Sequence, residues 1–269
     1  MIPVNRPIVT NIDAKSVYKV IKDGWISSNG PQVKIFENKL KKFIGKKYGS
    51  AVTSGTAALE IALKCINIKK NDEVIIPNFT IISNALAVIK QNAIPIPIDC
   101  DLKTWNMNVD LIEKSITKKT KAVIATHIYG YPLEIDKIKK ICKKKKIFLI
   151  EDAAQALGSY FKNKPLGSFG DFSCFSFHET KNFHSGAGGM IVINNKKYLD
   201  KVKMIYDKGT NRYLMQENKI KYYSWVEIGS AFLMTEFSAS FLNPQIQNYK
   251  EIILKRSKIY NRYLYLLSQ

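Results

Sequence analysis

A single lysine, Lys181, stands where an apolar segment gives way to a polar loop, within the run GDFSCFSFHETKNFHSGAGG from Gly170 to Gly189. Residues 172–177 predict a buried strand, and residues 190–193 predict the next one. A lysine between two strands, near glycines that let backbone and ligand come close, suits an amine nucleophile that forms a Schiff base with a carbonyl cofactor. Most lysines in a lysine-rich chain are solvated surface charges, so this interpretation depends on what surrounds Lys181.

A second candidate is the turn Ser54-Gly55-Thr56, which lies between a short apolar stretch and an Ala/Leu-rich helix that runs to Leu63. The start of such a helix offers free backbone N–H groups and the positive end of the helix dipole, and the two hydroxyl groups add donors. This arrangement suits a phosphate group. The alternative is an ordinary N-cap at Ser54, and the segment alone favours neither.

Strands and helices alternate through the middle of the chain. Helices of about a dozen residues between strands imply right-handed crossovers and a mostly parallel sheet that is covered on both faces. Strands are expected over 73–76, 94–98, 122–126, 147–150 and 172–177, and helices over 82–90, 109–115 and 133–145. Ligands of such sheets bind at the carboxyl ends of the strands. The groups expected to converge there are the Ser-Gly-Thr turn, His127, Asp152 and the end of the 172–177 strand.

The fold class expected is therefore a three-layer α/β/α fold with a mostly parallel central sheet. Helices are predicted over 11–23, which ends at Gly24, and from Val33 to Phe43, which ends at Gly45. Later helices are predicted over 198–207, from about Met234, and as one long helix over 243–269.

Composition is that of a soluble globular protein: 46% of the 269 residues are hydrophobic and 24% are charged, with no long apolar span. The N-terminal residues 1–10 lack a basic segment followed by an apolar one, which predicts a cytoplasmic protein without a membrane partner.

The net charge of +20 suggests nucleic-acid binding, but a lysine-rich coding bias explains the charge more simply. Only four basic residues are arginine: Arg6, Arg212, Arg256 and Arg262. Four widely spaced cysteines without a C-x-x-C pair indicate neither disulfides nor a metal site.

Lys181, Asp152 and the Ser-Gly-Thr turn together match the needs of pyridoxal phosphate. A carboxylate at the pyridine nitrogen keeps the ring protonated, the turn anchors the phosphate, and the lysine holds the aldehyde. Ser176, five residues before the lysine, is spaced to reach the phosphate from the adjoining strand. Taken alone, Asp152 would read better as a helix cap; taken with the other two features, it favours the cofactor.

Several motifs also resemble a known family, the DegT/DnrJ/StrS sugar aminotransferases, which are fold-type I enzymes that use pyridoxal phosphate. The motifs are SGTAALEIAL at 54–63, EDAAQALGS at 151–159, LGSFGDFSCFSFHETKN at 166–182 and GAGG at 186–189. The resemblance covers essentially the whole chain and implies an aspartate-aminotransferase-like large domain. It implies a cofactor-binding domain over residues 1–240, with 241–269 as the start of a C-terminal small domain that is largely missing.

The resemblance implies a role for each matching residue. Lys181 forms the Schiff base and then moves the proton between donor carbon and cofactor. Asp152 pairs with the pyridine nitrogen, and Gln155 contacts the ring hydroxyl. A lysine released in a dry pocket has a lowered pKa and suits a general base, which agrees with this role. The residues that hold the phosphate are Gly55, Thr56 and Ser176.

Three positions depart from the family pattern. Ile81 stands where an aromatic side chain usually stacks on the pyridine ring. Ala187 replaces an acidic residue of the glycine loop, and Ala231 stands where many members place Asn or Ser against the partner's cofactor phosphate. The family forms homodimers with active sites at the interface, so loops 25–31 and 210–231 are expected to contact substrate or a second subunit.

Within the family, three segments are similar to the dTDP-4-amino-4,6-dideoxygalactose transaminases. They are DKGTNR at 207–212, YSWVEIGSAFL at 223–233 and the motif FSFHETKN. This implies transfer of an amino group from glutamate to C4 of dTDP-4-dehydro-6-deoxyglucose, for cell-surface polysaccharide synthesis. Two alternatives stay open. One is a shortened relative that binds the cofactor without turnover, and the other is a 3-amino or GDP-sugar aminotransferase of the same family.

Overall fold

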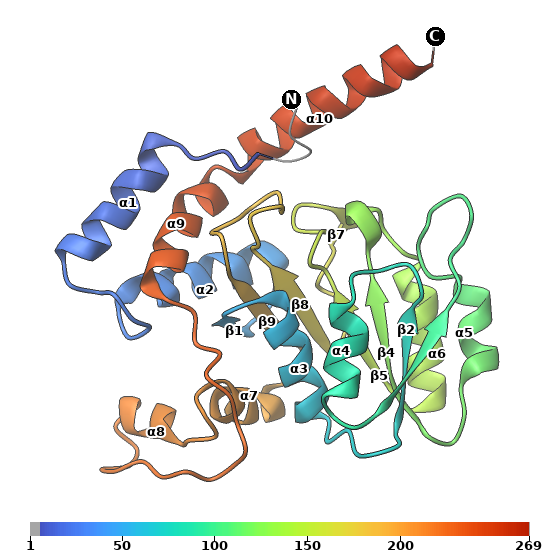
Figure 1. Cartoon of the computed structure of the whole chain (residues 1–269), viewed down its shortest axis with the longest axis horizontal. Helices are drawn as coiled ribbons and strands as arrows, with labels where there is room; N and C mark the ends of the chain where they lie inside the picture. The colour runs from blue at the N-terminus through green and yellow to red at the C-terminus, as the bar shows by residue number, and fades with distance from the viewer. Residues whose placement is uncertain (1–5, 269) are drawn as a thin grey trace.

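The central feature of the computed structural model, which describes residues 6–268, is a seven-stranded sheet (Figure 1). The sequence predicts no targeting segment over residues 1–10. Residues 1–5 of that stretch lie outside the described residues. The strands are β1 (Tyr48–Val52), β2 (Glu73–Pro77), β3 (Ile94–Ile98), β4 (Thr120–Thr126), β5 (Phe148–Asp152), β8 (Phe172–Ser176) and β9 (Gly189–Ile193).

The sheet is mostly parallel, as the alternating pattern predicts. Its order is β1-β9-β8-β5-β4-β2-β3. The pairs from β3 through β8 are parallel, whereas β9 runs antiparallel to both β8 and β1. Because β4, β5 and β8 are parallel neighbours, their carboxyl ends lie at one edge of the sheet. The residues expected at those ends share that edge.

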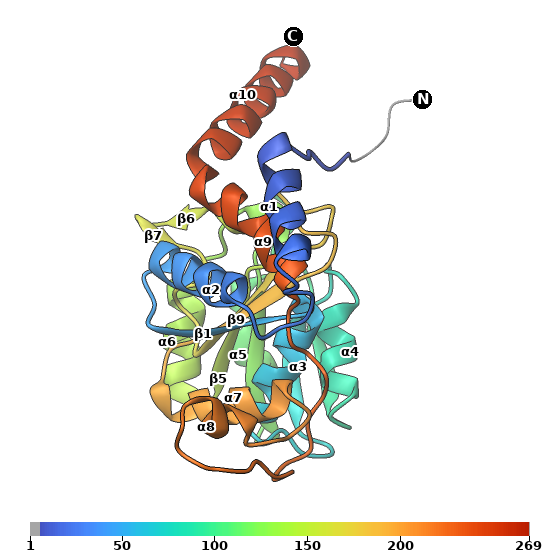
Figure 2. The same cartoon turned by 90° about the vertical axis from the view of Figure 1, so that its left-hand side faces the viewer.

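Helices cover both faces of the sheet and make it the middle of three layers (Figures 1 and 2). Side chains alternate between the faces along each strand. Ile124 of β4 packs in the cluster of one face, and Val123 packs in the cluster of the other. The first cluster includes residues of α3 (Gly55–Cys65), α4 (Ser83–Ile89) and α7 (Leu199–Tyr206), and the second those of α5 (Val109–Ser115) and α6 (Ile135–Lys145). The three-layer α/β/α expectation is confirmed.

Two N-terminal helices and α9 complete the core beside β1 and β9. α1 (Asn11–Lys22) and α2 (Pro31–Ile44) both pack on α9 (Glu236–Gln247). α2 ends at Gly45, which has a φ of 70° that glycine adopts without strain. The buried Glu236 carboxylate accepts the N–H of Gln32 at 2.6 Å, and so caps α2 from a distant part of the sequence.

The prediction of one helix over 243–269 is wrong. α9 ends at Gln247, and a second helix, α10, runs over Tyr249–Leu267, with the non-helical Asn248 between them. α9 is anchored by the buried Leu242 and Ile246, whereas α10 has no buried residue and projects from the body (Figure 1). α9 also runs across residue 240, and the division of the chain there into two domains stays a prediction.

Three short elements have no counterpart in the sequence-based predictions. They are β6 (Tyr160–Phe161) and β7 (Lys164–Pro165), which form a small hairpin, and α8 (Arg212–Gln216). Two or five residues are too few to show a periodic pattern.

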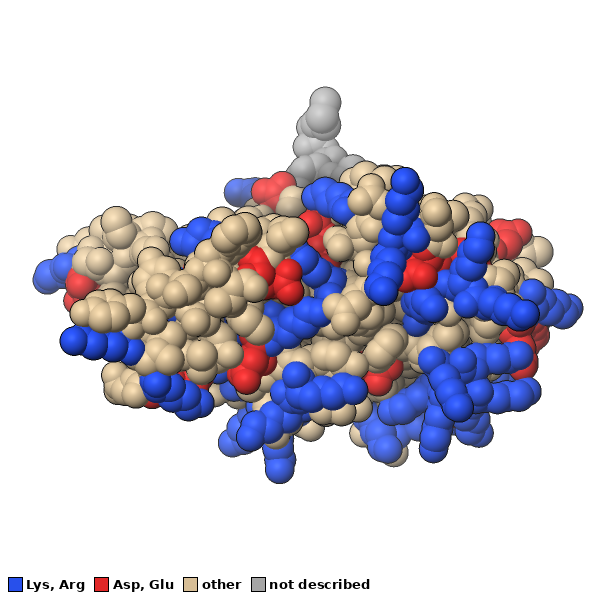
Figure 3. All heavy atoms as spheres, turned by 90° about the horizontal axis from the view of Figure 1, so that it is seen from below, with Lys and Arg blue, Asp and Glu red and all other residues tan. Residues whose placement is uncertain are grey.

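Basic side chains gather over the face shown in Figure 3, where acidic ones are fewer. Three lysines, Lys143, Lys144 and Lys145, lie in the last turn of α6, where positive charges interact favourably with the helix dipole. Among residues 6–268, no helix is long and apolar enough to cross a membrane, and no cluster of three potential metal ligands occurs.

Candidate active site

Asp152 ends β5 with its carboxylate buried on the α3–α4 side of the sheet. β5 and β4 are parallel and in register, so Thr126 lies directly beside Asp152. The Thr126 hydroxyl donates to Asp152 Oδ2 at 3.2 Å, and the Ala154 N–H donates to Oδ1 at 3.0 Å. Burial raises the pKa of Asp152, while these bonds and the charge of Lys181 oppose that rise. The site therefore contains a buried carboxylate whose ionised form is stabilised by these hydrogen bonds and by the charge of Lys181.

Lys181 lies in the loop that follows β8, half-buried, with its N–H donating to the His178 carbonyl at 2.9 Å. Burial lowers the pKa of its ammonium group, and the nearby Asp152 charge acts in the opposite direction. The structure thus brings the two residues close enough for their charges to interact. A lysine with a lowered pKa has more of the neutral amine that a nucleophile or base needs.

The Ser54-Gly55-Thr56 turn lies against the ends of β8 and β9. Ser54 is the N-cap of α3 and accepts from the Ala57 N–H at 3.0 Å, so the N-cap alternative is present in the structure. A Cβ at Gly55 would lie 2.9 Å from Cβ of Ser176, and one at Gly189 would lie 2.3 Å from the Ser54 carbonyl. Glycine at both positions therefore lets the start of α3 approach Ser176 closely.

Gln155 is held by the loop that follows β4. Its side-chain oxygen accepts from the Tyr129 N–H at 2.5 Å, and Tyr129 has a positive φ of 53°. The buried Asn106 fixes the same loop, since its side chain accepts from the Ile128 N–H and donates to the Tyr131 carbonyl. With its oxygen bound in this way, the Gln155 amide N–H groups are the ones left to donate elsewhere.

A cleft of about 1170 Å³ opens beside these residues. Gln155, Ser176 and Lys181 line it, whereas Asp152, Gly55 and Thr56 are not among the described residues at its surface. The opposite wall comes from α10, with Arg256 and Tyr260 among its residues. The cleft thus joins the lysine loop to the projecting C-terminal helix.

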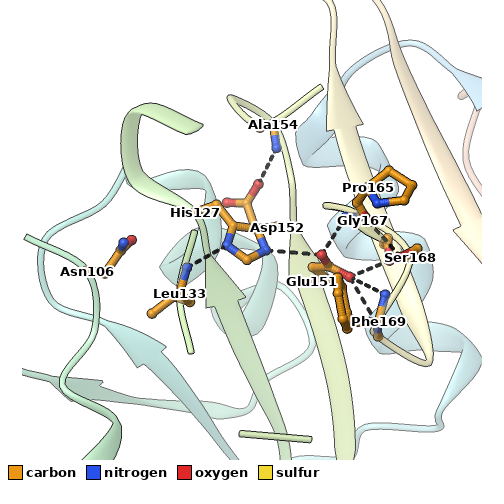
Figure 4. Close-up of polar contacts among 12 residues, drawn as sticks. Asn106, His127, Leu133, Glu151, Asp152, Ala154, Pro165, Gly167, Ser168 and Phe169 are labelled. Carbon is orange, nitrogen blue, oxygen red and sulfur yellow. Dashed lines mark hydrogen bonds and ion pairs between the residues drawn. The ribbon is translucent and has the colours of Figure 1, made fainter. Parts of the chain in front are cut away.

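The expectation that His127 lies with these residues is wrong, because His127 faces the opposite side of the sheet. Its ring and the side chain of Glu151 are fully buried, with 3.0 Å between His127 Nε2 and Glu151 Oε1 (Figure 4). The Leu133 N–H donates to Nδ1 at 3.1 Å, which assigns the ring proton to Nε2. Burial alone would raise the pKa of Glu151, but the bonds it accepts from His127 and from Gly167 and Gly170 lower it below its usual value.

The three positions that depart from the family pattern lie on the surface. Ile81 is 57% exposed, and Ala187 and Ala231 are exposed as well. The Ala187 carbonyl accepts from the Ser185 hydroxyl at 2.9 Å, which holds the glycine loop.

The residues present fit pyridoxal phosphate. Gly55 packs closely against Ser176, so the N-terminus of α3 and the Ser176 side chain lie side by side, which suits a phosphate group. Asp152 offers a buried carboxylate for a protonated ring nitrogen, and Lys181 offers a half-buried amine at the surface of the cleft.

The raised pKa of Asp152 predicts a pH dependence of stability. A folded state that binds the Asp152 proton more tightly than the unfolded state gains stability at low pH. That gain is lost as the pH rises from the usual carboxyl range through the raised pKa. We expect Asp152→Asn to raise the melting temperature of the cofactor-free protein at pH 7 by roughly 2–4 °C and to weaken cofactor binding. Calorimetry across pH checks this, with the exposed Asp23→Asn as control. A lower melting temperature in Asp152→Asn, or an unchanged pH slope, contradicts it.

Comparison with known proteins adds to this geometry. The model of the DegT/DnrJ/EryC1/StrS aminotransferase family matches residues 7–269. The chain belongs to this family. Membership of the DegT/DnrJ/EryC1/StrS family confirms the resemblance found in the motifs and agrees with the seven-stranded sheet.

Relatives within the family include enzymes named for sugar chemistry. The chain is 36% identical over 262 residues to GDP-perosamine synthase of Escherichia coli O157:H7, which covers 97% of the chain and 70% of that protein. It is 33% identical to the spore coat polysaccharide biosynthesis protein SpsC of Bacillus subtilis, with 97% and 68% covered. A Streptococcus pneumoniae protein, provisionally named a sugar aminotransferase and solved in its PLP form, matches with a TM-score of 0.89 at 28% identity, over 97% of this chain and 70% of that one.

These comparisons confirm a sugar aminotransferase of the pyridoxal-phosphate type at the level of the family. They do not support the dTDP-linked aminogalactose product, since two relatives, from Escherichia coli O157:H7 and Vibrio cholerae, are named GDP-perosamine synthase. The individual roles of all the site residues stay predictions, although the structure places Gly55 beside Ser176. These residues are Lys181, Asp152, Gly55, Thr56, Gln155 and Ser176. The sequence did not predict the contacts of Glu151, Thr126 and Asn84.

Proposed function

We propose that the protein is a pyridoxal-phosphate aminotransferase that transfers an amino group from glutamate to the C4 keto group of a nucleotide-linked 4-keto-6-deoxy sugar. The observation that carries the proposal is the convergence of a half-buried Lys181, a buried Asp152 and the glycine-lined start of α3. Family membership over residues 7–269 supports the same reaction class.

The cofactor supplies an electron sink for the negative charge that develops at the carbon bearing the transferred nitrogen. Asp152 holds a proton at the ring nitrogen, and Lys181 holds and moves the proton at the reacting carbon. Ser176 and the backbone N–H groups of Gly55 and Thr56 would bind the phosphate, while the Thr56 hydroxyl donates to Ser83 Oγ at 2.9 Å. Burial around these groups excludes water, which favours the neutral amine of Lys181.

The composition of the cleft favours a large anionic substrate. Among the described residues that line it there is no aspartate or glutamate, while Arg256 supplies positive charge. Tyrosine side chains at 129, 131, 260 and 263 add flat apolar surfaces and hydroxyl groups. Such a lining suits the phosphates and base of a nucleotide together with a sugar.

The nucleotide is proposed to be GDP rather than dTDP. Two relatives of this chain, from Escherichia coli O157:H7 and Vibrio cholerae, are GDP-perosamine synthases at 36% and 35% identity. The sequence motifs at residues 207–212 and 223–233 indicate dTDP, but they cover far fewer residues than the match to GDP-perosamine synthase. We therefore propose GDP.

Transamination assays test this function. Purified protein with pyridoxal phosphate and glutamate is expected to form 2-oxoglutarate when a GDP-linked 4-keto-6-deoxy sugar is added, and less with the dTDP-linked sugar. Product with the dTDP sugar alone would reverse the choice of nucleotide. Cofactor binding without product from any nucleotide sugar would support the alternative of a binding protein that does not turn over.

A second copy of this chain is the proposed partner. Large apolar side chains are exposed on the two loops expected at an interface, with Trp25 at 46%, Trp225 at 74% and Ile228 at 67%. Exposed apolar groups of this kind mark interaction surfaces. Sedimentation velocity is expected to give twice the 30.6 kDa chain mass, and a monomer at micromolar concentration would refute the proposal.

A further inference from the structure

The carboxylate of Asp152 is connected to helix α4 by a chain of buried hydrogen bonds. Asn84, in the first turn of α4, donates from Nδ2 to Thr126 Oγ1 at 2.7 Å. Thr126 in turn donates to Asp152 Oδ2 at 3.2 Å. All three side chains are at most 3% exposed. The chain therefore runs from a helix through two adjacent strands without contact with water.

Strand geometry explains why Thr126 is the link. Alternation along β4 places Thr126 on the α3–α4 side and His127 on the opposite side. The parallel register of β4 and β5 then puts Thr126 next to Asp152 rather than next to Glu151. Thr126 therefore faces the α3–α4 side of the sheet, where Asp152 lies, and His127 faces the opposite side.

Asn84 has a contact pattern that stability alone does not explain. Its Nδ2 also donates to Thr80 Oγ1 at 2.9 Å, in the turn that carries Ile81. Its Oδ1 is buried and has no hydrogen-bond partner among the described residues. A buried carbonyl oxygen without a partner lowers stability, so an apolar side chain would suit this position better if packing were its only role.

We propose that Asn84 and Thr126 are positioning residues that hold the Asp152 carboxylate in the orientation needed to meet the ring nitrogen of the cofactor. This inference rests on the proposed function, because it assigns the partner of Asp152. With Ala154 on Oδ1 and Thr126 on Oδ2, both oxygens have a fixed donor and the plane of the carboxylate is set. The same donors favour its ionised form against burial.

The first turn of α4 also contacts the phosphate-binding turn. Ser83, the neighbour of Asn84, accepts from the Thr56 hydroxyl at 2.9 Å. Adjacent residues of one helix turn thus contact both ends of the proposed cofactor site. This arrangement provides a matched control, because Ser83 contacts Thr56 whereas Asn84 contacts the residues around Asp152.

Thr126→Val tests the proposal, because valine keeps the shape of threonine and removes the hydroxyl. In the cofactor-free full chain, we expect the midpoint of the Asp152 carboxyl signal in isotope-labelled protein to move to higher pH, with Asp152→Asn assigning the signal. The dissociation constant for pyridoxal phosphate is expected to rise about tenfold. Asn84→Leu is expected to shift both quantities in the same direction.

Thr126→Ser retains the hydroxyl and is expected to stay within about twofold of wild type in cofactor affinity, with the Asp152 midpoint unchanged. Ser83→Ala is expected to leave the Asp152 midpoint unchanged. Equal midpoints in Thr126→Val and wild type overturn the inference, and so does a shift in Ser83→Ala as large as that in Thr126→Val. The titration needs no cofactor and no turnover, so its result is separate from failure of the proposed function.

Discussion

Lys181→Ala is expected to remove the absorbance band that lysine-linked pyridoxal phosphate gives near the edge of the visible range, and to lower kcat for amino transfer by at least roughly 10³-fold. Proton transfer by a positioned side chain contributes about 10²–10⁴-fold to such reactions, and this lysine also holds the cofactor. Lys181 lines the cleft with its pKa lowered by burial. Spectra and steady-state rates of the purified variant measure both effects.

Two controls separate this role from the loss of a charge. Lys181→Arg keeps a cation that does not deprotonate and is expected to be as inactive as the alanine variant. Lys39 also has a pKa lowered by burial, but its ammonium group donates to the Asn243 carbonyl, and it is not among the residues that line the cleft. Lys39→Ala is expected to retain the absorbance band. A Lys181→Ala protein with wild-type activity would refute the proposed chemistry.

Glu151→Leu is expected to lower the free energy of unfolding by about 3–5 kcal/mol, as loss of one partner from a buried charged network does. The Glu151 carboxylate is fully buried, and leucine would leave its donors without an acceptor. Those donors are His127 Nε2, the Ser173 hydroxyl and the N–H groups of Gly167, Phe169 and Gly170. Denaturant unfolding at pH 7 measures the loss.

The pH dependence gives this prediction a second readout. The pKa of Glu151 is lowered in the folded state, so its contribution is present above the usual carboxyl range and is lost as the pH falls through the lowered value. Glu151→Leu is expected to flatten the acid side of the stability profile. Glu113, which pairs with Lys144 on the surface, is the control, and Glu113→Gln is expected to leave the free energy of unfolding nearly unchanged, because exposed ion pairs contribute little. A similarly small cost for Glu151→Leu would contradict the prediction.

Local patterns in the sequence predicted the sheet and the helices that cover it, because each long element has its own signal. The strand over 94–98 and the helix over 109–115 match β3 and α5 residue for residue. The break at Asn248 was missed because apolar residues at helical spacing continue from α9 into α10. The packing of α9 on α1 and α2 decides where the two helices separate, and local periodicity carries no information about it.

Among the candidate site residues, Lys181 and Asp152 had a local sequence signal, whereas Thr126 and Glu151 did not. Lys181 and Asp152 follow apolar segments, whereas Thr126 is the last residue of the strand predicted over 122–126 and Glu151 directly follows the one predicted over 147–150. The signal that could have separated them is strand alternation. Consecutive residues such as Glu151 and Asp152 face opposite sides, so one carboxylate serves the cleft side and the other packs with His127. The contact of Asn84 needs the position of α4 over β4, which no local pattern gives.

α10 has a consequence for how this enzyme could diversify. The cofactor end of the cleft is embedded in the sheet and its buried contacts, whereas the opposite wall is a helix without a buried residue that joins the body at Asn248. Arg256 and Tyr260 of α10 face the cleft, whereas Asp152 ends β5 and Lys181 follows β8. We therefore expect substitutions of Arg256 or Tyr260 to change which substrate binds, while the residues proposed to hold the cofactor stay unchanged.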